Sequence, residues 1–381
     1  MMNNKLALYL HFPFCKRKCR YCDFLSFPAD GQERERYILR LLEEIRCKAS
    51  SLSGRTVSTI YMGGGTPSLM SGAQMGRLMD CIRENFSLAS DAEITAECNP
   101  GTVDFDKLAA YRQAGINRIS FGLQSSRQEE LDRLGRIHSC GQFEGNYYMA
   151  RKAGFDNINI DLMSGLPGQS LESWQQTLRF CVGLAPEHIS AYSLIVEPGT
   201  PFEKLYGEDG SRREELPDED TEREMYHATA RILAAAGYGR YEISNYSLPG
   251  RQCRHNLVYW LRGDYLGLGL GSSSMICNCR MTNPADYRQY MESFEPAGRE
   301  IISRKGQIGE TMILGLRLMQ GVDEAAFEAA FGTGLHDIYG DVIEGYCRQG
   351  FLQDDGKYLS LTEKGIDVSN WILADFLLDE E

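Results

Sequence analysis

Six short runs rich in β-branched and aromatic residues alternate with amphipathic helical stretches along the first half of the chain. The runs are residues 6–12, 57–62, 93–98, 118–123, 157–163 and 188–196. The helical stretches between them include residues 36–45, 73–82, 105–115 and 172–181. Strands that alternate with helices pair in parallel through right-handed crossovers. The pattern predicts an α/β fold, built either as an open doubly wound sheet or as a partial (β/α)6 TIM-like barrel.

The length of 381 residues leaves room for a second unit after such a barrel. The alternation gives way to an acidic polar connection, GEDGSRREELPDED, and near the C-terminus helical patterns lead into the hairpin-like GFLQDDGKYLSLTEKG. We therefore predict three parts. They are a partial barrel over 1–206, a connecting region over 207–306 that packs on the barrel, and a small winged-helix-like α+β domain over 307–381.

The charge of the chain argues against a nucleic acid partner. The formal net charge is −13, and a chain of this sign repels phosphate. Winged helices often bind DNA, but Arg348, Lys357 and Lys364 are the only Lys and Arg in residues 322–381. We therefore expect the C-terminal domain to pack on the barrel or to act as a lid.

Cysteine usage and the N-terminal residues predict a cytoplasmic protein. Twelve cysteines are dispersed through the chain, which favours reduced thiols or metal ligands over a disulfide framework. The opening stretch MMNNKLALYLHFPF soon meets the charged KRKCR, unlike a signal peptide. No apolar stretch approaches the ~18 residues that a membrane helix needs.

Polar motifs follow the ends of the predicted strands. They are the cysteines of residues 15–22, GGGTP at 63–67, ECNP at 97–100, GLQS at 122–125 and DLMSGLPGQ at 161–169. Ligands bind at the carboxyl edge of parallel sheets. We therefore expect these motifs to converge in one site.

Cys15, Cys19 and Cys22 lie within eight residues, in the segment HFPFCKRKCRYCDF. A structural zinc site needs four ligands, and no histidine has the spacing to complete it. Three thiolates suit a cubane iron–sulfur cluster, because they leave one iron open to a further ligand. The sequence predicts such a cluster on this loop.

The spacing C-x3-C-x2-C, with Tyr21 before the last cysteine, resembles the signature of the radical S-adenosylmethionine (SAM) superfamily. The resemblance implies a 4Fe-4S cluster, SAM as a second cofactor, and the partial barrel of that superfamily for residues 1–206. It also assigns SAM contacts to the strand-end motifs, since glycines allow close approach and carboxylates suit ribose hydroxyls or an ammonium group. The implied contacts are Tyr9, Tyr21, Gly64, Gly65, Thr66, Glu97, Gln124, Arg136, Asp161 and Ser193. Ser193 differs from the residue that the oxidases described next carry there.

The whole chain is similar to the oxygen-independent coproporphyrinogen III oxidase family. The shared motifs include LYLHFPFC, YMGGGTPSL, ECNPG, RISFGLQS, LGRIHS, NIDLMSGLPGQ and YSLIVEPGTP. Two departures stand out: the oxidases carry a further cysteine where this chain has Phe24, and a longer segment before the motif than the fourteen residues ahead of Cys15. In both departures the chain resembles the heme chaperone branch of the family.

The segment HNLVYW, residues 255–260, is similar to the HNxxYW pattern associated with heme in that branch. A neutral imidazole is a common axial ligand of heme iron, and aromatic rings offer flat apolar faces. The resemblance implies heme contacts from His255, Tyr259 and Trp260. The alternative is a core histidine packed beside two aromatic residues.

The remaining motif cysteines do not predict a second metal site. Cys253, Cys277 and Cys279 lie near HNLVYW, but the chain has no CxxCH heme-attachment motif. A C-x-C pair without further ligands is unremarkable.

The leading functional expectation is a heme chaperone that binds a 4Fe-4S cluster, SAM and heme and transfers heme to acceptor proteins. The alternatives are radical decarboxylation of coproporphyrinogen III, radical opening of the heme ring and, more remotely, RNA modification. Whether SAM is cleaved stays open, and no residue is assigned as catalytic. The resemblance implies heme and heme-accepting proteins as partners, and it leaves open peripheral membrane association and a homodimer.

Overall fold

The computed structural model describes residues 4–378, and its centre is a set of six parallel strands. They are β1 (Lys5–Phe12), β2 (Thr56–Gly64), β3 (Ser87–Cys98), β4 (Arg118–Gln124), β5 (Ile158–Ser164) and β6 (His188–Ser193). Each strand pairs in parallel with the next one along the chain. Since the order does not reverse, the sheet has no topological switch point, and the partial barrel is confirmed over the doubly wound alternative.

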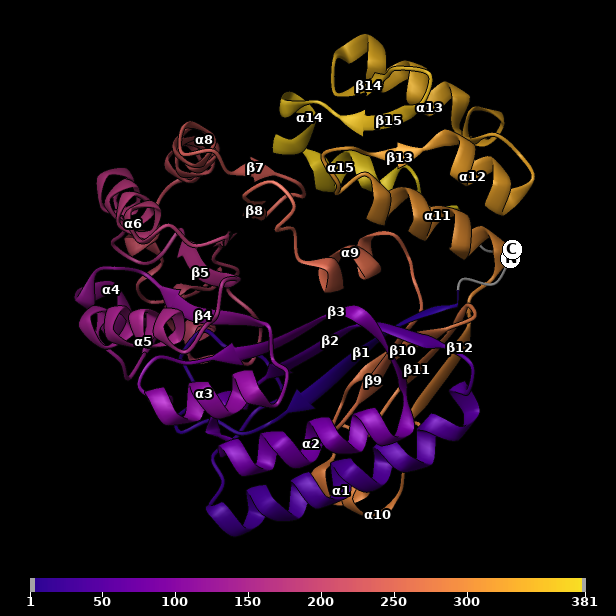
Figure 1. Cartoon of the computed structure of the whole chain (residues 1–381). Helices are drawn as coiled ribbons and strands as arrows, with labels where there is room; N and C mark the ends of the chain where they lie inside the picture. Colours follow the sequence, from indigo (N-terminus) through magenta and orange to yellow (C-terminus); the bar gives the residue numbers. More distant parts are fainter. Residues whose placement is uncertain (1–3, 379–381) are drawn as a thin grey trace.

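Helices between the strands cover the outer face of the sheet (Figure 1). They are α1 (Gly31–Ala49), α2 (Gly72–Asn85), α3 (Phe105–Gln113), α4 (Gln128–Leu134), α5 (Cys140–Lys152) and α6 (Leu171–Leu184). Ser71, Ser139 and Ser170 each begin a helix with a capping box, in which the serine side chain accepts from the third helical residue. One apolar stripe of each helix then packs on the strands, and all seven residues of β4 are buried.

The sheet extends beyond the six predicted strands at both edges. One edge adds β9 (Tyr265–Leu268), parallel to β1, followed by antiparallel β10 (Ser273–Ile276), β11 (Cys279–Thr282) and β12 (Gly298–Ile301). The other edge adds antiparallel β8 (Asn245–Ser247) and β7 (Gly239–Arg240), giving a sheet of 12 strands. The sequence pattern missed these edge strands because they are two to four residues long and carry weak alternation.

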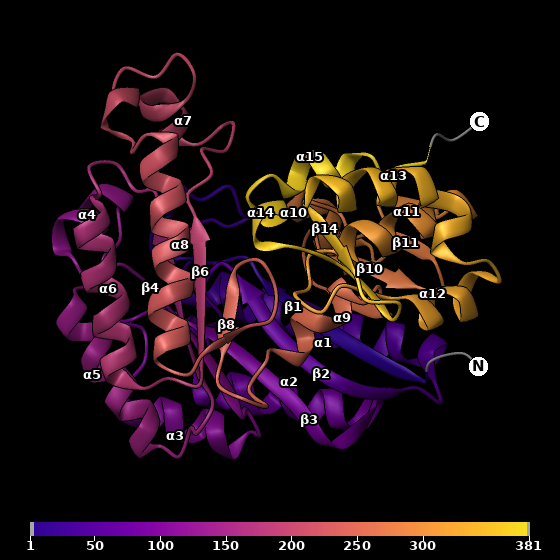
Figure 2. The ribbon, with the colours of Figure 1, turned by 90° about the horizontal axis from the view of Figure 1, so that it is seen from above.

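Further helices follow the six parallel strands. They are α7 (Pro201–Tyr206), α8 (Glu219–Ala235), α9 (Arg254–Trp260) and α10 (Tyr287–Glu292). Short 3-10 turns lie at Ser50–Leu52, Pro67–Leu69 and Arg213–Glu215. Helix α8 packs against α6, and the α7 region projects from one end of the molecule (Figure 2). Helix α9, which carries HNLVYW, lies on the inner face opposite α1 and α2 (Figure 1).

The C-terminal domain has its own core. It contains α11 (Arg304–Gly315), α12 (Glu324–Phe331), α13 (Leu335–Gln349), α14 (Glu363–Asp367) and α15 (Ser369–Ala374), with β13 (Val322–Asp323), β14 (Leu352–Asp354) and β15 (Tyr358–Leu361). The three strands form an antiparallel sheet separate from the barrel. This confirms a small α+β domain after the barrel. The domain boundary at residue 307 stays a prediction. The first buried residue of the second core is Ile308, which is compatible with that boundary.

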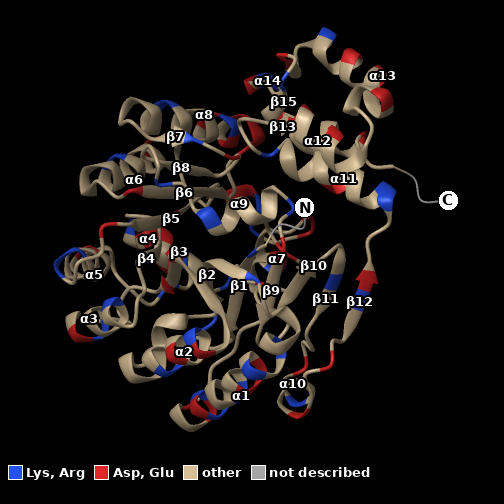
Figure 3. Ribbon diagram, turned by 45° about the vertical axis from the view of Figure 1, so that its right-hand side comes forward, with Lys and Arg blue, Asp and Glu red and all other residues tan. Residues whose placement is uncertain are grey.

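Charged residues concentrate on the helices and loops (Figure 3), and of the six central strands β2 and β6 carry no Lys, Arg, Asp or Glu. All twelve cysteines are free thiols. Within residues 4–378, none of the helices combines the length and apolar character required to span a membrane.

Candidate functional site

The cysteine loop lies at the carboxyl end of β1 and is tied to three other segments. The Cys15 amide donates to the carbonyl of Phe27 at 3.1 Å, and the Arg20 amide donates to the carbonyl of Leu134 at 3.0 Å. The Phe202 amide donates to the carbonyl of Arg20 at 3.1 Å. The main chain therefore holds the loop in a defined position, with its three cysteines half-buried.

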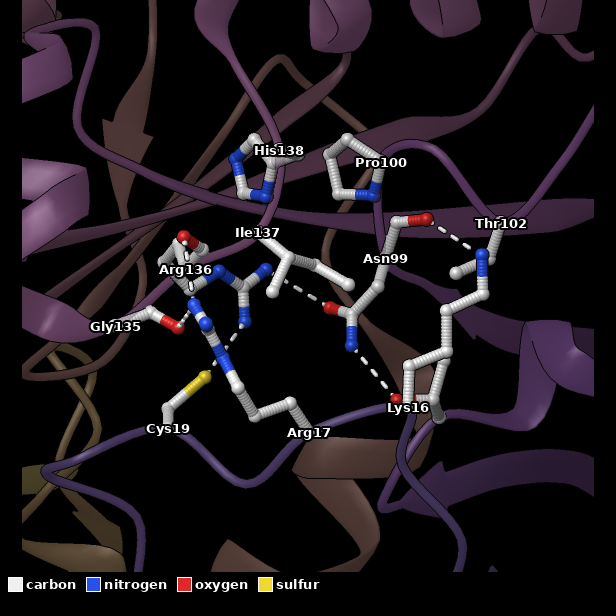
Figure 4. A pocket seen from close by; sticks show the side chains of 11 residues that line it. Lys16, Arg17, Cys19, Asn99, Pro100, Thr102, Gly135, Arg136, Ile137 and His138 are labelled. Carbon is white, nitrogen blue, oxygen red and sulfur yellow. Dashed lines mark hydrogen bonds between the residues drawn. The ribbon is translucent and has the colours of Figure 1, made fainter. Parts of the chain in front are cut away.

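Polar groups from other strand ends contact the cysteine sulfurs. The Thr66 hydroxyl donates to Cys15 Sγ at 3.3 Å, and Arg136 Nη1 donates to Cys19 Sγ at 3.6 Å (Figure 4). Burial raises the pKa of the Cys22 thiol to about 11. Metal binding requires thiolates, so binding of a metal or cluster would release the proton of this thiol.

The spacing of these sulfurs fits a cluster better than a single ion. Within residues 4–378, one set of three ligand side chains has donor atoms that all lie within 4.8 Å of one another. That set lies in the C-terminal domain and does not include the cysteine loop. The sulfurs of the cysteine loop are spread more widely. A cubane presents its irons at separate corners, so it suits such a spread.

Arg136 links the cysteine loop to the ends of β3 and β4. Its Nη2 donates to Asn99 Oδ1 at 2.9 Å and also to the carbonyl of Gly122. Its Nε is buried and meets no hydrogen-bond partner among the described residues. The surrounding pocket is lined by Lys16, Arg17, Cys19, Thr66, Asn99, Pro100, Thr102, Gly135, Arg136, Ile137 and His138 (Figure 4). A buried cation with a spare donor suits a carboxylate ligand.

Glu97 lies on the inner face of the barrel beside the glycine motif. Its carboxylate accepts a 3.0 Å hydrogen bond from the Tyr61 hydroxyl and another from the Gly64 amide. Burial and the negative charge of Asp161 raise the pKa of Glu97 to about 8. Gly64 has φ +106°, and a Cβ there would stand 2.5 Å from the His11 ring, so this close approach requires glycine. A buried carboxylate of this kind suits a cationic ligand.

The other predicted SAM contacts lie around the same inner face. Asp161 accepts from Ser120 Oγ at 2.8 Å and from Asn159 Nδ2 at 2.7 Å. Gln124 ends β4 with φ 71°, and Ser193 is exposed at the end of β6. Direct contacts join Cys15 with Thr66, Cys19 with Arg136, and Glu97 with Gly64. Asn99 bridges Thr66 and Arg136.

Tyr9 and Tyr21 are both half-buried but contact different parts of the barrel. Tyr9, within β1, hydrogen-bonds His11 Nδ1 through its hydroxyl at 3.1 Å and stacks on Tyr61 with ring centroids 6.4 Å apart. Tyr21, on the cysteine loop, packs its ring against Phe202 with centroids 6.3 Å apart.

The His255 imidazole is enclosed and both of its nitrogens are occupied. Nδ1 hydrogen-bonds Thr59 Oγ1 at 2.9 Å, and Nε2 hydrogen-bonds the Tyr259 hydroxyl at 2.9 Å. The ring stacks on Tyr61 at 5.2 Å and is 1% exposed. Burial, with the charge of Arg118, lowers the pKa of His255 to about 3. This arrangement matches the core-histidine alternative, because no nitrogen is open to a ligand.

Sequence reasoning missed the buried residues that hold α9 in place. Glu93 accepts from the amides of Arg254 at 3.1 Å and His255 at 3.0 Å, at the first turn of the helix. Arg118 is buried nearby at 1% exposure. A signal was present, since Glu93, Thr95 and Glu97 alternate along β3 and therefore face the same side.

The C-terminal end of α9 faces the C-terminal domain. Tyr259 packs edge-on against Tyr265 at 4.7 Å, and the Arg317 guanidinium lies 4.8 Å from the centre of the Trp260 ring. Trp260 Nε1 is buried, and the part of the chain that the structure describes offers it no acceptor. Trp260 therefore lies at the interface between the barrel and the C-terminal domain, whereas His255 and Tyr259 contact β2 and β9 of the barrel.

Comparison with known families agrees with this two-part organisation. Residues 9–181 match the model of the radical SAM superfamily, and residues 302–368 match the model of the HemN C-terminal domain. Among solved structures, the chain is similar to the coproporphyrinogen III oxidase HemN from Escherichia coli, described as a radical SAM enzyme. The TM-score is 0.85 at 27% identity, over 98% of this chain and 90% of that one.

Curated relatives match over nearly the full length. The heme chaperone HemW of Escherichia coli strain K12 is 39% identical over 381 residues, covering 98% of both chains. The heme chaperone HemW of Lactococcus lactis is 36% identical over 383 residues, covering 100% of this chain and 99% of the relative. The similarity thus includes both the barrel and the C-terminal domain.

Proposed function

Because the chain belongs to the HemW heme chaperone family of radical SAM proteins, we propose that it binds a 4Fe-4S cluster, SAM and heme and transfers the heme to acceptor proteins. The observation that carries this proposal is the contact of the Cys15 and Cys19 thiols with Thr66 and Arg136, beside the third loop thiol of Cys22. The proposal includes a cytoplasmic location, heme-accepting proteins as partners, peripheral contact with membranes that hold such acceptors, and a homodimer.

In this proposal Cys15, Cys19 and Cys22 hold the cluster. When bound, it supplies an open iron for SAM and a one-electron donor. The protein's own residues orient SAM by charge. Arg136 pairs with the SAM carboxylate through its spare buried Nε, and Glu97 pairs with the SAM ammonium group.

Further SAM contacts are proposed by carry-over from the family motifs. Gly64, Gly65 and Thr66 bring the main chain close to the amino acid part of SAM, and Asp161 and Gln124 face the ribose. The remaining proposed contacts are Tyr9, Tyr21 and Ser193. Asp161 is already oriented by Ser120 and Asn159, so its carboxylate needs little rearrangement to accept from hydroxyl groups.

For heme, we propose contacts from His255, Tyr259 and Trp260 that follow a rearrangement of α9. His255 reaches a heme iron only if the Tyr259 hydroxyl releases Nε2. Trp260, which stacks with Arg317 at the domain interface, offers an aromatic face beside a cation. Heme binding in this form therefore includes a local opening between α9 and the C-terminal domain.

The same site gives less support to coproporphyrinogen oxidation. Phe24 stands where the oxidases place a further cysteine, and its side chain is exposed at 62%. An apolar ring at the rim cannot supply the ligand or the redox group that a thiol would. We therefore propose that the chain lacks oxidase activity.

Anaerobic reconstitution followed by two assays tests this function. The first titrates the reconstituted protein with heme and then adds an apo-heme protein as acceptor. The second incubates it with SAM, a reductant and coproporphyrinogen III. We expect stoichiometric heme binding and transfer in the first assay and no formation of protoporphyrinogen IX in the second.

Other results would contradict the proposal in different ways. Protoporphyrinogen formation would establish an oxidase. Loss of the heme spectrum only when SAM and reductant are both present would establish a ring-opening enzyme. Absence of heme binding in the reconstituted protein would remove the chaperone function.

A further inference from the structure

A histidine and two carboxylates converge in the C-terminal domain, far in sequence from the cysteine loop. Glu324 is the first residue of α12, His336 is the second residue of α13, and Asp354 ends β14. His336 Nε2 lies 3.0 Å from Asp354 Oδ2 and 3.8 Å from Glu324 Oε2. All three donor atoms lie within 4.8 Å of one another.

The spacing is close to what one metal ion requires. Zinc holds nitrogen and oxygen ligands at about 2.0–2.2 Å in a tetrahedron, which places neighbouring ligand atoms roughly 3.4 Å apart. The observed separations of 3.0 and 3.8 Å bracket this value. Small side-chain movements would bring the third pair of atoms to the same separation.

Asp354 and Glu324 each place one carboxylate oxygen near His336 Nε2, namely Oδ2 and Oε2. Asp354 accepts the Gly356 amide at 2.8 Å through Oδ1, which leaves Oδ2 facing His336. Glu324 Oε1 is buried and finds no donor within residues 4–378. A buried carboxylate oxygen without a donor is costly unless a cation or a proton satisfies it.

The local charge favours a cation over the histidine alone. Glu324 and Asp354 bring two carboxylates to a single imidazole, so their like charges repel each other. A divalent ion would replace this repulsion with attraction.

We propose that Glu324, His336 and Asp354 form a three-ligand site for a divalent transition-metal ion of the zinc class, with its remaining positions filled by water. One imidazole and two carboxylates are ligands that such ions accept, and none of the three belongs to the cluster site. The ion would tie the β14–β15 hairpin to the beginnings of α12 and α13. The site stabilises the C-terminal domain and is independent of heme transfer.

Mn²⁺ is the suitable probe, because it prefers oxygen and nitrogen ligands to the many thiols of this chain. The full-length protein with its cluster in place is titrated with Mn²⁺, and free Mn²⁺ is followed by EPR. The variants are His336→Gln and Asp354→Asn. The matched control is His227→Gln, because His227 forms a histidine–carboxylate pair with Asp367 at 3.3 Å outside the three-ligand cluster.

The wild-type protein and His227→Gln should bind one more Mn²⁺ ion than His336→Gln and Asp354→Asn, or bind it at least about tenfold more tightly. Zn²⁺ should displace that ion and raise the melting temperature of the wild-type protein but not of His336→Gln. Equal Mn²⁺ binding by wild type and both cluster variants would overturn the proposal and leave an ion pair only. Circular dichroism of each variant checks that a loss of binding is not a loss of folding.

Discussion

The hydroxyl of Tyr61 donates a 3.0 Å hydrogen bond to Oε1 of Glu97. The same tyrosine ring stacks on His255 with centroids 5.2 Å apart. One side chain on β2 therefore contacts both the proposed SAM-binding carboxylate and the HNLVYW helix. A movement of α9 that exposes His255 would remove the ring on which Tyr61 stacks, so the proposed heme and SAM sites are linked through Tyr61.

Arg136→Ala is expected to weaken SAM binding by about tenfold to a hundredfold, because a charge-assisted hydrogen bond in a buried site contributes about 1.5–3 kcal/mol. Equilibrium binding of SAM to the reconstituted protein measures the effect, with iron content determined in parallel because Arg136 also contacts Cys19. Arg127→Ala, a half-exposed arginine before α4, serves as the control. An unchanged dissociation constant in Arg136→Ala would rule out the proposed carboxylate contact.

Cys19→Ala should abolish the cluster, since the two remaining thiolates cannot hold a cubane with one open iron. Iron and sulfide analysis with visible absorbance after anaerobic reconstitution measures the loss. Cys140→Ala removes a half-buried thiol outside the loop and should leave the cluster intact. Full iron and sulfide content in Cys19→Ala would refute the assignment of the cluster loop.

The raised pKa of Glu97 predicts how the free energy of unfolding of the cofactor-free protein depends on pH. Its pKa is about 8 in the folded chain and about 4.5 when unperturbed, so between these values the folded state holds a proton that the unfolded state releases. The contribution of Glu97 to the free energy of unfolding should therefore fall as pH rises from about 4.5 to about 8 and level off above that.

Urea unfolding from about pH 5 to about pH 9 tests this sign. Glu97→Gln should reduce the fall relative to wild type, because the amide does not titrate. Glu43→Gln alters an exposed carboxylate of α1 and should follow the wild-type curve. A Glu97→Gln curve parallel to wild type would show that this carboxyl does not titrate in that range.

His255→Ala should lower the free energy of unfolding by about 2–4 kcal/mol, because it leaves a cavity and deprives two buried hydroxyls of their partner. Those hydroxyls belong to Thr59 and Tyr259. His255→Gln, which keeps a hydrogen-bonding group, should lose less. Urea unfolding measures both, and the half-exposed His227→Ala is the control. Stability equal to wild type would show that the ring is not held as the structure describes.

Much of the barrel could be predicted from local pattern. Alternating strands and helices located β1, β2, β4 and β5 to within one or two residues, although β6 ends at Ser193, three residues before the predicted end, and β3 begins at Ser87, six residues before its predicted start. The family resemblance implied Arg136 as a residue of the SAM site, and its guanidinium lies 3.6 Å from Cys19 Sγ.

Interactions between distant segments could not be predicted in this way. The edge strands β7–β12 are stabilised by their neighbours in the sheet rather than by their own alternation. From the HNLVYW segment alone, His255 could equally be a ligand or a core residue. Its state depends on Thr59, Tyr61 and Glu93, which the fold brings to it from β2 and β3.

Residue type and spacing along the chain were thus sufficient for the barrel, the cysteine loop and the family, since each depends on short-range periodicity or on chemistry within a few residues. Burial, the availability of a nitrogen on His255, the raised pKa of Glu97 and the meeting of Glu324 with His336 and Asp354 arise only in the folded chain. They depend on which groups shield one another from water and which charges come into contact. Both are decided by residues that become neighbours only in the folded chain.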